Sequence, residues 1–473
     1  MTPDQAAPID ATNAGALESL YRDHLQKLDG WLTDAVERAA KHGIRAQGVI
    51  FHAGRPGFYH RDDRFVVFRS TAHFRRWAPP LSGPEHLVAA RPGKRPLVVR
   101  VTPPDFWYDT SPPEPSHWEA SVELHEVASF AAAVAALRGA VGSLDGWAYF
   151  GDSDEAAAEL GIDTTMVEPE ALRLPLDWHR ATKTAYEVAL SREACRAAAA
   201  GHLAARAQLE AGSSELDTHL AYLAAARCVE EELPFDSIIA QDEKSAILHY
   251  QRKRRDGGEN ARVLLVDSGA DHHGYASDIT RTWVRAEGTA AGATVPATFR
   301  SLAAAVDAME RRLVAMVGPG RSYVEIHLEC HRQIADILHA HKILRCSPEE
   351  ALEKRLTRTF MPHGVGHLLG LQVHDVGGHQ SAPDGGETPP PDDHVLRNTR
   401  TLEPGHLVTI EPGLYFIPML LDEQRSGADA NLFDWALIDE LIPCGGIRIE
   451  DDVLCTEQGY DDLSRGFFES AEI

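Results

Sequence analysis

Three histidines, His363, His367 and His374, lie within residues 359–378, which read TFMPHGVGHLLGLQVHDVGG. Imidazole binds divalent metal ions and carries protons near neutral pH, so this cluster could serve either chemistry. The glycines between the histidines allow the backbone to turn and to approach a ligand closely. The run lacks the glutamate of the helical HExxH zinc signature, so histidines that serve only the core are the alternative. Carboxylates elsewhere in the chain must decide between the two interpretations.

The segment VLLVDSGADHHGYASDITRTW (263–283) carries two candidate carboxylates. An apolar strand delivers Asp267, a glycine-containing turn follows, and a second strand carries Asp278. In a hairpin the two aspartates can face each other across the ladder. Two negative charges this close are unfavourable unless a cation or a proton lies between them. The segment by itself leaves open that one aspartate merely ends a strand.

Two further carboxylates follow in the last quarter of the chain. Glu411 comes directly after the apolar strand of HLVTIEPGLYF (406–416), where a buried carboxylate is costly without a partner. In GGIRIEDDVL (445–454) the alternation of a strand places Arg448 and Glu450 on one face and Ile447 and Ile449 on the other. A surface Arg–Glu pair is the alternative here.

The candidates together form a set of four carboxylates and one imidazole. Such a set suits two divalent cations of the Mn²⁺ type, and bridging carboxylates can hold such ions about 3.5–4 Å apart and activate a water. The predicted ligands are Asp267, Asp278, His367, Glu411 and Glu450.

The elements that must position these residues alternate between helices and strands. A helix over 16–42, strands over 47–54, 95–101 and 146–151, and a helix over 129–140 predict a mixed α/β N-terminal domain. Downstream we expect helices over 183–212, from Ser214 with Asp217, and across 298–342, then strands, with a proline-rich loop at 381–393. The chain has 473 residues, which predicts two domains: a flexible tail (1–15), an N-terminal domain (16–175) and a C-terminal domain (176–473), of α+β class.

Composition excludes several classes of partner. The formal net charge of −25 argues against binding to nucleic acid or to an anionic membrane. No apolar stretch is long enough to span a bilayer, and the N-terminus has neither the basic start nor the apolar core of a signal peptide. The six cysteines form no CxxC pair, which favours free thiols in a reducing compartment. We therefore expect a cytoplasmic protein.

Four segments, DSGADHHGYASDITRT, PHGVGHLLGLQVHDVGG, TIEPGLYF and GGIRIEDD, closely resemble the metal-binding motifs of the pita-bread metallopeptidases. This family includes methionine aminopeptidase, aminopeptidase P and prolidase, and the resemblance is most specific to the bacterial prolidases (Xaa-Pro dipeptidases). LRNTRTLEPGHLVTIEPGLYFIPMLL and FDWALIDELIPCGGIRIEDDVL carry it at the C-terminus. VIFHAG, HRDDRFVVF, FRRWAPP and PPDFWYDTSPPEPSHW extend it into the N-terminal domain.

The resemblance implies a creatinase-like N-terminal domain followed by a C-terminal pita-bread (creatinase/aminopeptidase-like) catalytic domain. It also implies that the five candidates hold two ions per subunit, most often Mn²⁺ with Co²⁺ or Zn²⁺ as alternatives, and that Asp278 and Glu450 bridge them. A hydroxide between the ions would attack the scissile carbonyl, and Glu411 would transfer its proton to the prolyl nitrogen. Arg448 would orient carboxylate ligands.

The resemblance further implies a set of substrate-binding residues. His363, His374 and His249 would contact the substrate and its transition state, and Arg397 would bind the C-terminal carboxylate of a dipeptide. Asp63 would reach the pocket of the partner subunit in a homodimer. Phe235 stands where bacterial prolidases usually have tyrosine, so the substrate preference is open. Tyr323 and Val373 complete the implied set.

Three alternatives to a dipeptidase follow from the same motifs. Aminopeptidase P uses the same ligands on longer peptides and needs no clamp on the carboxylate of the second residue. Some relatives of the bacterial prolidases also hydrolyse organophosphates, so this is a possible side activity. Pita-bread domains can lose their metals and act as interaction modules, but such modules typically lack the ligands that are all present here.

Overall fold

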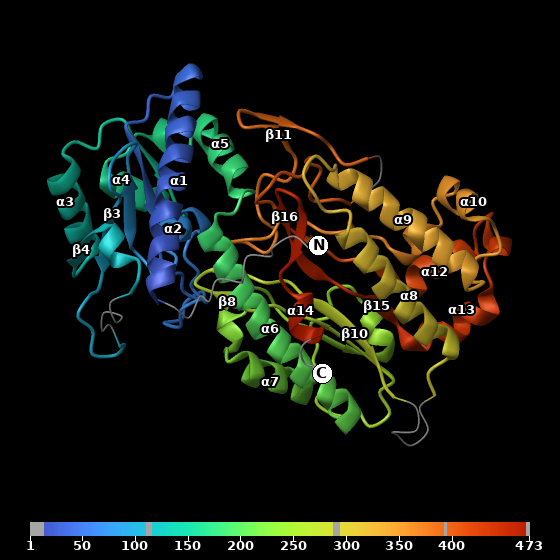
Figure 1. Ribbon diagram of the computed structural model, residues 1–473. Coiled ribbons are helices and arrows are strands. Elements are labelled where there is room, and N and C mark those ends of the chain that lie inside the picture. Colours follow the sequence, from blue (N-terminus) through green and yellow to red (C-terminus); the bar gives the residue numbers. More distant parts are fainter. Residues whose placement is uncertain (1–13, 110–115, 287–293, 392–394, 470–473) are drawn as a thin grey trace. The chain divides into compact units, whose positions relative to one another are not determined.

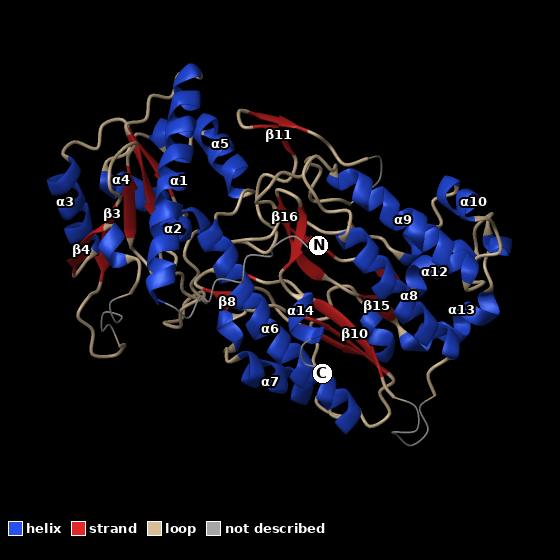
Figure 2. Ribbon diagram, viewed as in Figure 1, coloured by secondary structure: helices blue, strands red, loops and turns tan. Residues whose placement is uncertain are grey.

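The computed structural model describes residues 14–109, 116–286, 294–391 and 395–469 (Figure 1; Figure 2). Its contacts divide the chain into two compact units. Unit 1 runs to Leu190 and includes His272–Tyr275 and Ser381–Gly386, and unit 2 contains the remainder. The division falls inside α6 (Ala185–Ala211), downstream of the boundary expected at 175/176. The expected tail (1–15) lies outside the described residues apart from its last two.

Unit 1 contains a five-stranded sheet in the order β4-β3-β2-β1-β5. The pairs β1–β2 and β2–β3 are antiparallel, whereas β1–β5 and β3–β4 are parallel. Strands β1, β2, β3 and β5 are buried along their whole length, as their mainly apolar residues predict. The strands are β1 (Gly48–His52), β2 (Leu87–Ala90), β3 (Leu97–Val101), β4 (Glu123–Val127) and β5 (Trp147–Phe150).

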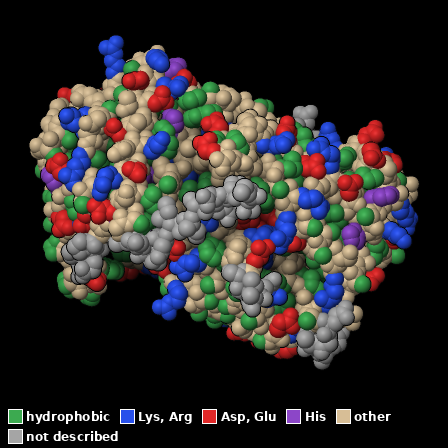
Figure 3. Space-filling view, viewed as in Figure 1, with side chains coloured by type: hydrophobic (Ala, Val, Ile, Leu, Met, Phe, Trp, Pro, Cys, Tyr) green, Lys and Arg blue, Asp and Glu red, His purple; other side chains and the backbone are tan. Residues whose placement is uncertain are grey.

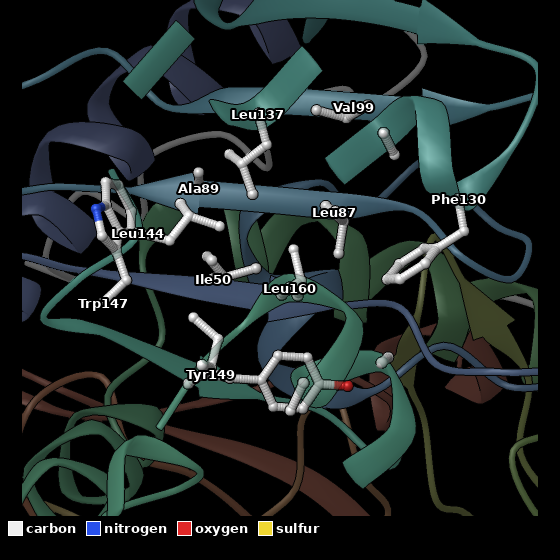
Figure 4. Packing of buried hydrophobic residues seen from close by; sticks show 14 of the residues in the cluster. Ile50, Leu87, Ala89, Val99, Phe130, Leu137, Leu144, Trp147, Tyr149 and Leu160 are labelled. Carbon is white, nitrogen blue, oxygen red and sulfur yellow. The ribbon is translucent and has the colours of Figure 1, made fainter. Parts of the chain in front are cut away.

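The core of unit 1 lies between this sheet and two helices of the same unit. Ile50, Leu87 and Val99 from the strands pack with Leu137 and Leu160 from the helices (Figure 4). The helix expected over 129–140 is α3 (Phe130–Val141), which Ser129 caps by accepting the Ala132 N–H. The other helices of this unit are α1 (Ala14–Lys41), α2 (Ala72–Trp77), α4 (Asp154–Leu160) and α5 (Glu170–Arg180).

Unit 2 holds three small antiparallel sheets, β10-β7-β6, β13-β16-β17 and β14-β15. Their strands are rich in buried aliphatic residues, so each sheet has a dry face. The strands are β6 (Ile238–Gln241), β7 (Val263–Asp267), β10 (Thr280–Val284), β13 (Leu407–Ile410), β14 (Gly413–Tyr415), β15 (Gly446–Arg448), β16 (Asp451–Thr456) and β17 (Gly459–Asp462).

Helices α6 and α7 (Glu215–Ala226) cover the first of these sheets (Figure 1). Leu209 and Tyr222 from the helices pack against Leu264 and Val266 of β7. The predicted cap is present, since the Ser214 side chain accepts the N–H of residue 217. The helical region expected across 298–342 consists of two helices, α8 (Ala297–Val314) and α9 (Tyr323–Ala340). Gly-Pro-Gly at 318–320 explains the break.

The remaining elements are short. The loop expected at 381–393 contains a hairpin that turns at Pro383 and Asp384, directly before Gly385 and Gly386, which both have positive φ. Residues 392 and 393 of this loop lie outside the described part. The short strands are β8 (Asp271–His272), β9 (Tyr275–Ala276), β11 (Gln380–Ala382) and β12 (Gly385–Glu387), and the helices are α10 (Pro348–Glu353), α11 (Thr357–Phe360), α12 (Pro418–Arg425), α13 (Trp435–Leu441) and α14 (Arg465–Glu469). Single 3₁₀ turns occur at Glu119–Ser121, Thr164–Met166, Glu230–Glu232, Asp242–Ala246, Ala430–Leu432 and Ile442–Cys444.

The surface mixes both signs of charge. On the face drawn in Figure 3, acidic and basic side chains are interspersed among hydrophobic ones. Among the helices that the structure describes, none combines the length and the apolar character needed to cross a bilayer. All six cysteines are described, and all are free thiols.

Candidate metal centre

Two strands of unit 2 deliver the first pair of carboxylates. Asp267 is the last residue of β7, and Asp278 lies two residues before the start of β10. The expected hairpin is present, but the residue directly across from Asp267 is Thr280, so Asp278 lies beyond the paired part of the ladder. The short β8–β9 hairpin occupies the turn between them. Asp278 is nevertheless close enough that its negative charge helps to raise the pKa of Asp267.

The ends of three other strands bring in the remaining candidates. Glu411 follows β13 directly, and Glu450 lies in the break between β15 and β16, where its N–H donates to the Thr280 carbonyl at 3.0 Å. His367 is tied to Thr409 of β13, because the His367 N–H donates to Thr409 Oγ1 at 3.1 Å and the Thr409 N–H donates to the His367 carbonyl at 3.0 Å. The strands of unit 2 therefore position the whole set.

Three of these side chains form a tight buried group. Asp278, His367 and Glu450 each offer one ligand atom, and these atoms lie within 4.8 Å of one another. His367 Nε2 lies 3.4 Å from Asp278 Oδ2 and 3.7 Å from Glu411 Oε1. Asp267 Oδ1 is buried, and the described residues offer it no hydrogen-bond donor.

The electrostatics of the group call for positive charge. Burial raises the pKa of Asp267 to about 6 and that of Glu411 to about 7, although Arg448 opposes both shifts. Burial and the neighbouring carboxylates raise the pKa of Glu450 well above its usual range. Burial alone would lower the pKa of His367, but Asp278 and Glu411 raise it to about 9. A cation bound beside such carboxylates would favour their ionised form over the protonated, neutral form.

The residues present therefore fit a site for divalent cations. Carboxylate oxygens and an imidazole nitrogen are the ligands that ions of the Mn²⁺ type accept. The unpartnered oxygen of Asp267 gives a further ligand atom at the edge of the tight group. Buried polar atoms without partners are uncommon in proteins, and a bound ion would satisfy this one.

Arg448 links the carboxylates of Asp267 and Glu450 through hydrogen bonds. Its Nη2 donates to Asp267 Oδ2 at 2.6 Å, its Nη1 to the Tyr415 hydroxyl at 2.8 Å, and its Nε to Thr280 Oγ1 at 3.2 Å. The Thr280 hydroxyl in turn donates to Glu450 Oε2 at 2.6 Å. Arg448 and Glu450 thus share one face, as strand alternation predicts. Sequence reasoning missed Thr280 and Tyr415, although both lie inside motifs that it singled out, DITRT and EPGLYF.

His363 is held in one tautomer by a chain of hydrogen bonds. Because Arg448 donates to the Tyr415 oxygen, the Tyr415 proton is directed to His363 Nε2 at 2.9 Å. His363 Nδ1 then donates to the Gly364 carbonyl at 2.7 Å. Burial and the Arg448 charge lower the pKa of His363 to about 3, so the ring is neutral at physiological pH.

His374 lies beside the ligand histidine. Its ring stands edge-on to that of His367, with the centroids 4.5 Å apart. Partial burial and the charges of His367 and Arg397 lower the pKa of His374 to about 4. The charge of His249 contributes to the low pKa of both His363 and His374, which places His249 near them.

The other predicted site residues differ in their surroundings. Tyr323 is fully buried, and its hydroxyl donates to the Thr409 carbonyl at 2.6 Å, behind the segment that carries His367. Phe235 and Val373 are half-buried in unit 2, and Arg397 is exposed there. Asp63 is exposed on unit 1, so the group assembled within unit 2 does not include it.

The chain is similar to known proteins along almost all of its length. A profile of metallopeptidase family M24 matches residues 189–457, and a profile of the Xaa-Pro dipeptidase N-terminal domain matches residues 19–178. The Xaa-Pro dipeptidase of Xanthomonas campestris pv. campestris (strain 8004) is 38% identical over 454 residues, covering 96% of this chain and 98% of that protein. The Xaa-Pro dipeptidase of Shewanella loihica is 35% identical, covering 95% and 98%.

Solved structures agree on the fold. Aminopeptidase P of Escherichia coli in its low-pH form superposes with a TM-score of 0.67 at 22% identity, covering 95% of this chain and 99% of that one. Pseudomonas aeruginosa aminopeptidase PepP gives a TM-score of 0.65 at 20% identity, covering 93% and 98%. The α+β fold with a C-terminal pita-bread domain is thereby confirmed. Because the M24 profile spans more than half of the chain and the relatives align along nearly all of it, the chain belongs to metallopeptidase family M24.

Proposed function

We propose that this chain is a metal-dependent dipeptidase that hydrolyses Xaa-Pro dipeptides. The observation that carries the proposal is the buried Asp278–His367–Glu450 group, with Asp267 and Glu411 at its edge and Arg448 behind it. Relatives aligned over nearly their whole length are Xaa-Pro dipeptidases. An interaction module would have no need to bury so many carboxylates together.

When bound, two divalent cations would supply an activated water and would polarise the scissile carbonyl. Glu411 is placed to handle the proton, since its Oε1 lies 3.7 Å from the ligand His367 and its Oε2 lies 3.9 Å from His363. It would accept a proton from the attacking water and pass it to the prolyl nitrogen. That nitrogen belongs to a tertiary amide, so it leaves readily only when it is protonated.

The neutral histidines would stabilise the developing negative charge. A neutral imidazole donates one N–H, and His374 beside His367 would direct its N–H to the carbonyl oxygen of the substrate. His363 is fixed by Tyr415 and the Gly364 carbonyl, so its ring would provide a rigid wall beside Glu411. His249 would complete this side of the site.

Arg397 would set the length of the substrate. The guanidinium is exposed, and its charge contributes to the low pKa of His374, which supports a place for Arg397 at the rim of the site. A guanidinium fork binds a carboxylate through two parallel hydrogen bonds. In an Xaa-Pro dipeptide the proline carboxylate would occupy this fork, and a longer peptide would have no carboxylate there. Phe235 and Val373 would border the pocket.

We further propose Mn²⁺ as the preferred metal, a homodimer as the active form and the cytoplasm as its compartment. The hard oxygen ligands favour Mn²⁺, and the free thiols favour a reducing compartment. The Asp63 loop carries exposed aromatic side chains, since Phe58 and Phe65 are 55% and 39% exposed and their rings lie 4.5 Å apart. Exposed apolar groups of this kind mark interaction surfaces, and a second subunit would cover them.

Cleavage of matched peptides tests the proposal. Purified protein loaded with Mn²⁺ should hydrolyse Ala-Pro and Gly-Pro, leave Ala-Pro-Ala almost untouched, and lose activity on chelation. The C-terminal amide of Ala-Pro is the matched control, because it keeps the scissile bond and removes only the carboxylate. Cleavage of the tripeptide and the amide at the rate of the dipeptide would establish an aminopeptidase P-like enzyme instead.

A further inference from the structure

A further buried carboxylate, that of Asp452, contacts the main chain of a predicted metal ligand. Asp452 lies on β16 and is fully buried, two residues after Glu450. Its side chain accepts the main-chain N–H of Asp278, at 3.1 Å to Oδ2 and 3.3 Å to Oδ1. The bond fixes the backbone that carries the Asp278 carboxylate, which itself lies 3.4 Å from His367 Nε2.

Asp452 is itself held from two other sides. The Cys195 thiol of α6 donates to Oδ2 at 3.2 Å, and the Asp452 N–H donates to Ser464 Oγ at 3.1 Å. Cys195 and Ser464 are both fully buried. Buried groups that are hydrogen-bonded to one another have little freedom to move. The position of the Asp452 carboxylate is therefore defined by its packing as well as by its own strand.

The register of the strands connects this contact with a second ligand. Asp452 pairs with Thr409 across the β13–β16 ladder, and Thr409 exchanges hydrogen bonds with His367 through its hydroxyl and its N–H. One cross-strand pair therefore contacts the segments of two metal ligands. A shift of one strand against the other would move Asp278 and His367 apart.

We propose that Asp452 is a positioning residue of the metal centre. By fixing the Asp278 main chain, it sets the distance from the Asp278 carboxylate to His367 and Glu450, and the Cys195 thiol fixes Asp452 in turn. The proposal rests on the metal-dependent function proposed above. Groups that orient metal ligands typically change metal affinity by about 10–100-fold when they are removed.

Co²⁺ titration of the metal-stripped full-length protein tests this role, with the affinity and the visible absorption spectrum of bound Co²⁺ as readouts. Asp452→Ala should weaken Co²⁺ binding by about 10–100-fold and change the spectrum, because Asp278 loses its anchor. Asp452→Asn keeps one acceptor oxygen and should give a smaller loss. Glu310→Gln is the matched control, since Glu310 is equally buried but is bonded to Arg465 rather than to the chain of a ligand.

The control should melt at a lower temperature without metal and bind Co²⁺ with unchanged affinity and spectrum. Wild-type affinity and spectrum in Asp452→Ala would overturn the proposal, as would an equal loss in Glu310→Gln. If the Asp452 variants do not melt cooperatively, the Cys195 variants decide. Cys195→Ala should weaken Co²⁺ binding and Cys195→Ser, which keeps a donor, should restore it, whereas wild-type binding in both would overturn the proposal.

Ala-Pro cleavage by the wild-type protein tests the dipeptidase proposal separately from the role of Asp452. Wild-type protein that binds Co²⁺ but does not cleave Ala-Pro would remove the dipeptidase proposal alone, because the Co²⁺ affinities still decide the role of Asp452. Wild-type protein that binds no Co²⁺ would overturn both.

Discussion

The Thr280 hydroxyl donates to Glu450 Oε2 at 2.6 Å and accepts the Arg448 Nε–H at 3.2 Å. It therefore turns one carboxylate oxygen toward β10 and leaves the other for the metal centre. Thr280→Val has nearly the same shape but loses both bonds, and a hydrogen bond to a charged group contributes about 1.5–3 kcal/mol. We expect metal affinity and kcat/KM to fall by about 10–100-fold, measured by titration and by Ala-Pro hydrolysis. Thr280→Ser, which keeps the hydroxyl, should have a metal affinity and a kcat/KM close to those of the wild type. Wild-type values of both in Thr280→Val would exclude this orienting role.

Removal of one ligand charge should act on both metal ions when the ligand lies at the centre of the group. Asp278 and Glu450 belong to the tight group with His367, whereas Asp267 and Glu411 lie at its edge. Asp278→Asn and Glu450→Gln should therefore lower bound metal and kcat more than Asp267→Asn does. Elemental analysis of dialysed protein checks the stoichiometry. Two bound ions in Glu450→Gln would contradict a shared ligand.

Loss of the guanidinium at Arg397 should affect the KM for dipeptides. Arg397→Ala removes two charge-assisted hydrogen bonds to the proline carboxylate, so KM should rise by about 10–100-fold while metal content stays unchanged. Arg397→Lys keeps the positive charge but not the two parallel donors, so its KM should lie between those of the wild type and Arg397→Ala. Because the amide of Ala-Pro has no carboxylate, its slow cleavage should be the same in wild type and Arg397→Ala. An equal loss on the amide would place Arg397 in another role.

Asp63 tests whether the active enzyme needs a partner subunit. In a homodimer its carboxylate would meet the free ammonium of the dipeptide, so Asp63→Ala should raise KM by about tenfold and leave metal content intact. Asp62→Ala is the matched control, because Asp62 caps its own loop by accepting the Arg64 N–H at 3.1 Å. Sedimentation at the assay concentration provides the oligomeric state. A fully active monomer, or an unchanged KM, would remove Asp63 from the site.

The sequence predicts most of the ligand-bearing elements, because the candidate carboxylates lie next to strands of buried residues, as Asp267 and Glu411 do after β7 and β13. It predicts that Asp267 and Asp278 can face each other across a hairpin ladder, whereas the ladder pairs Asp267 with Thr280. The reason is the short β8–β9 hairpin, which takes up residues of the turn and shifts the register. The orienting contacts of Thr280 and Asp452 join residues more than 165 positions apart, and no local pattern encodes such contacts.

A buried ion pair in unit 1 should make stability depend on pH, independently of the metal centre. Glu187 accepts from Arg76 Nε at 3.2 Å, from the Tyr275 hydroxyl at 2.9 Å and from the Thr184 N–H at 2.8 Å. Burial alone would raise the pKa of Glu187, but Arg76, His24 and Lys183 together with the Thr184 N–H outweigh it and lower the pKa to about 2. The folded protein therefore holds this carboxylate ionised at a pH where the unfolded chain has already bound a proton.

Because the folded pKa lies below the unfolded value, the contribution is complete above about pH 4.5 and is lost as the pH falls toward 2. A shift from about 4.5 to about 2 corresponds to about 3 kcal/mol. In metal-stripped protein, Glu187→Gln should lower the free energy of unfolding by a larger amount at pH 6 than at pH 3, as urea titrations at both values would measure. The variant also leaves the Arg76 charge without its partner, so a loss of stability remains at low pH. A difference between wild type and variant that does not change with pH would show that Glu187 is not held ionised by these groups.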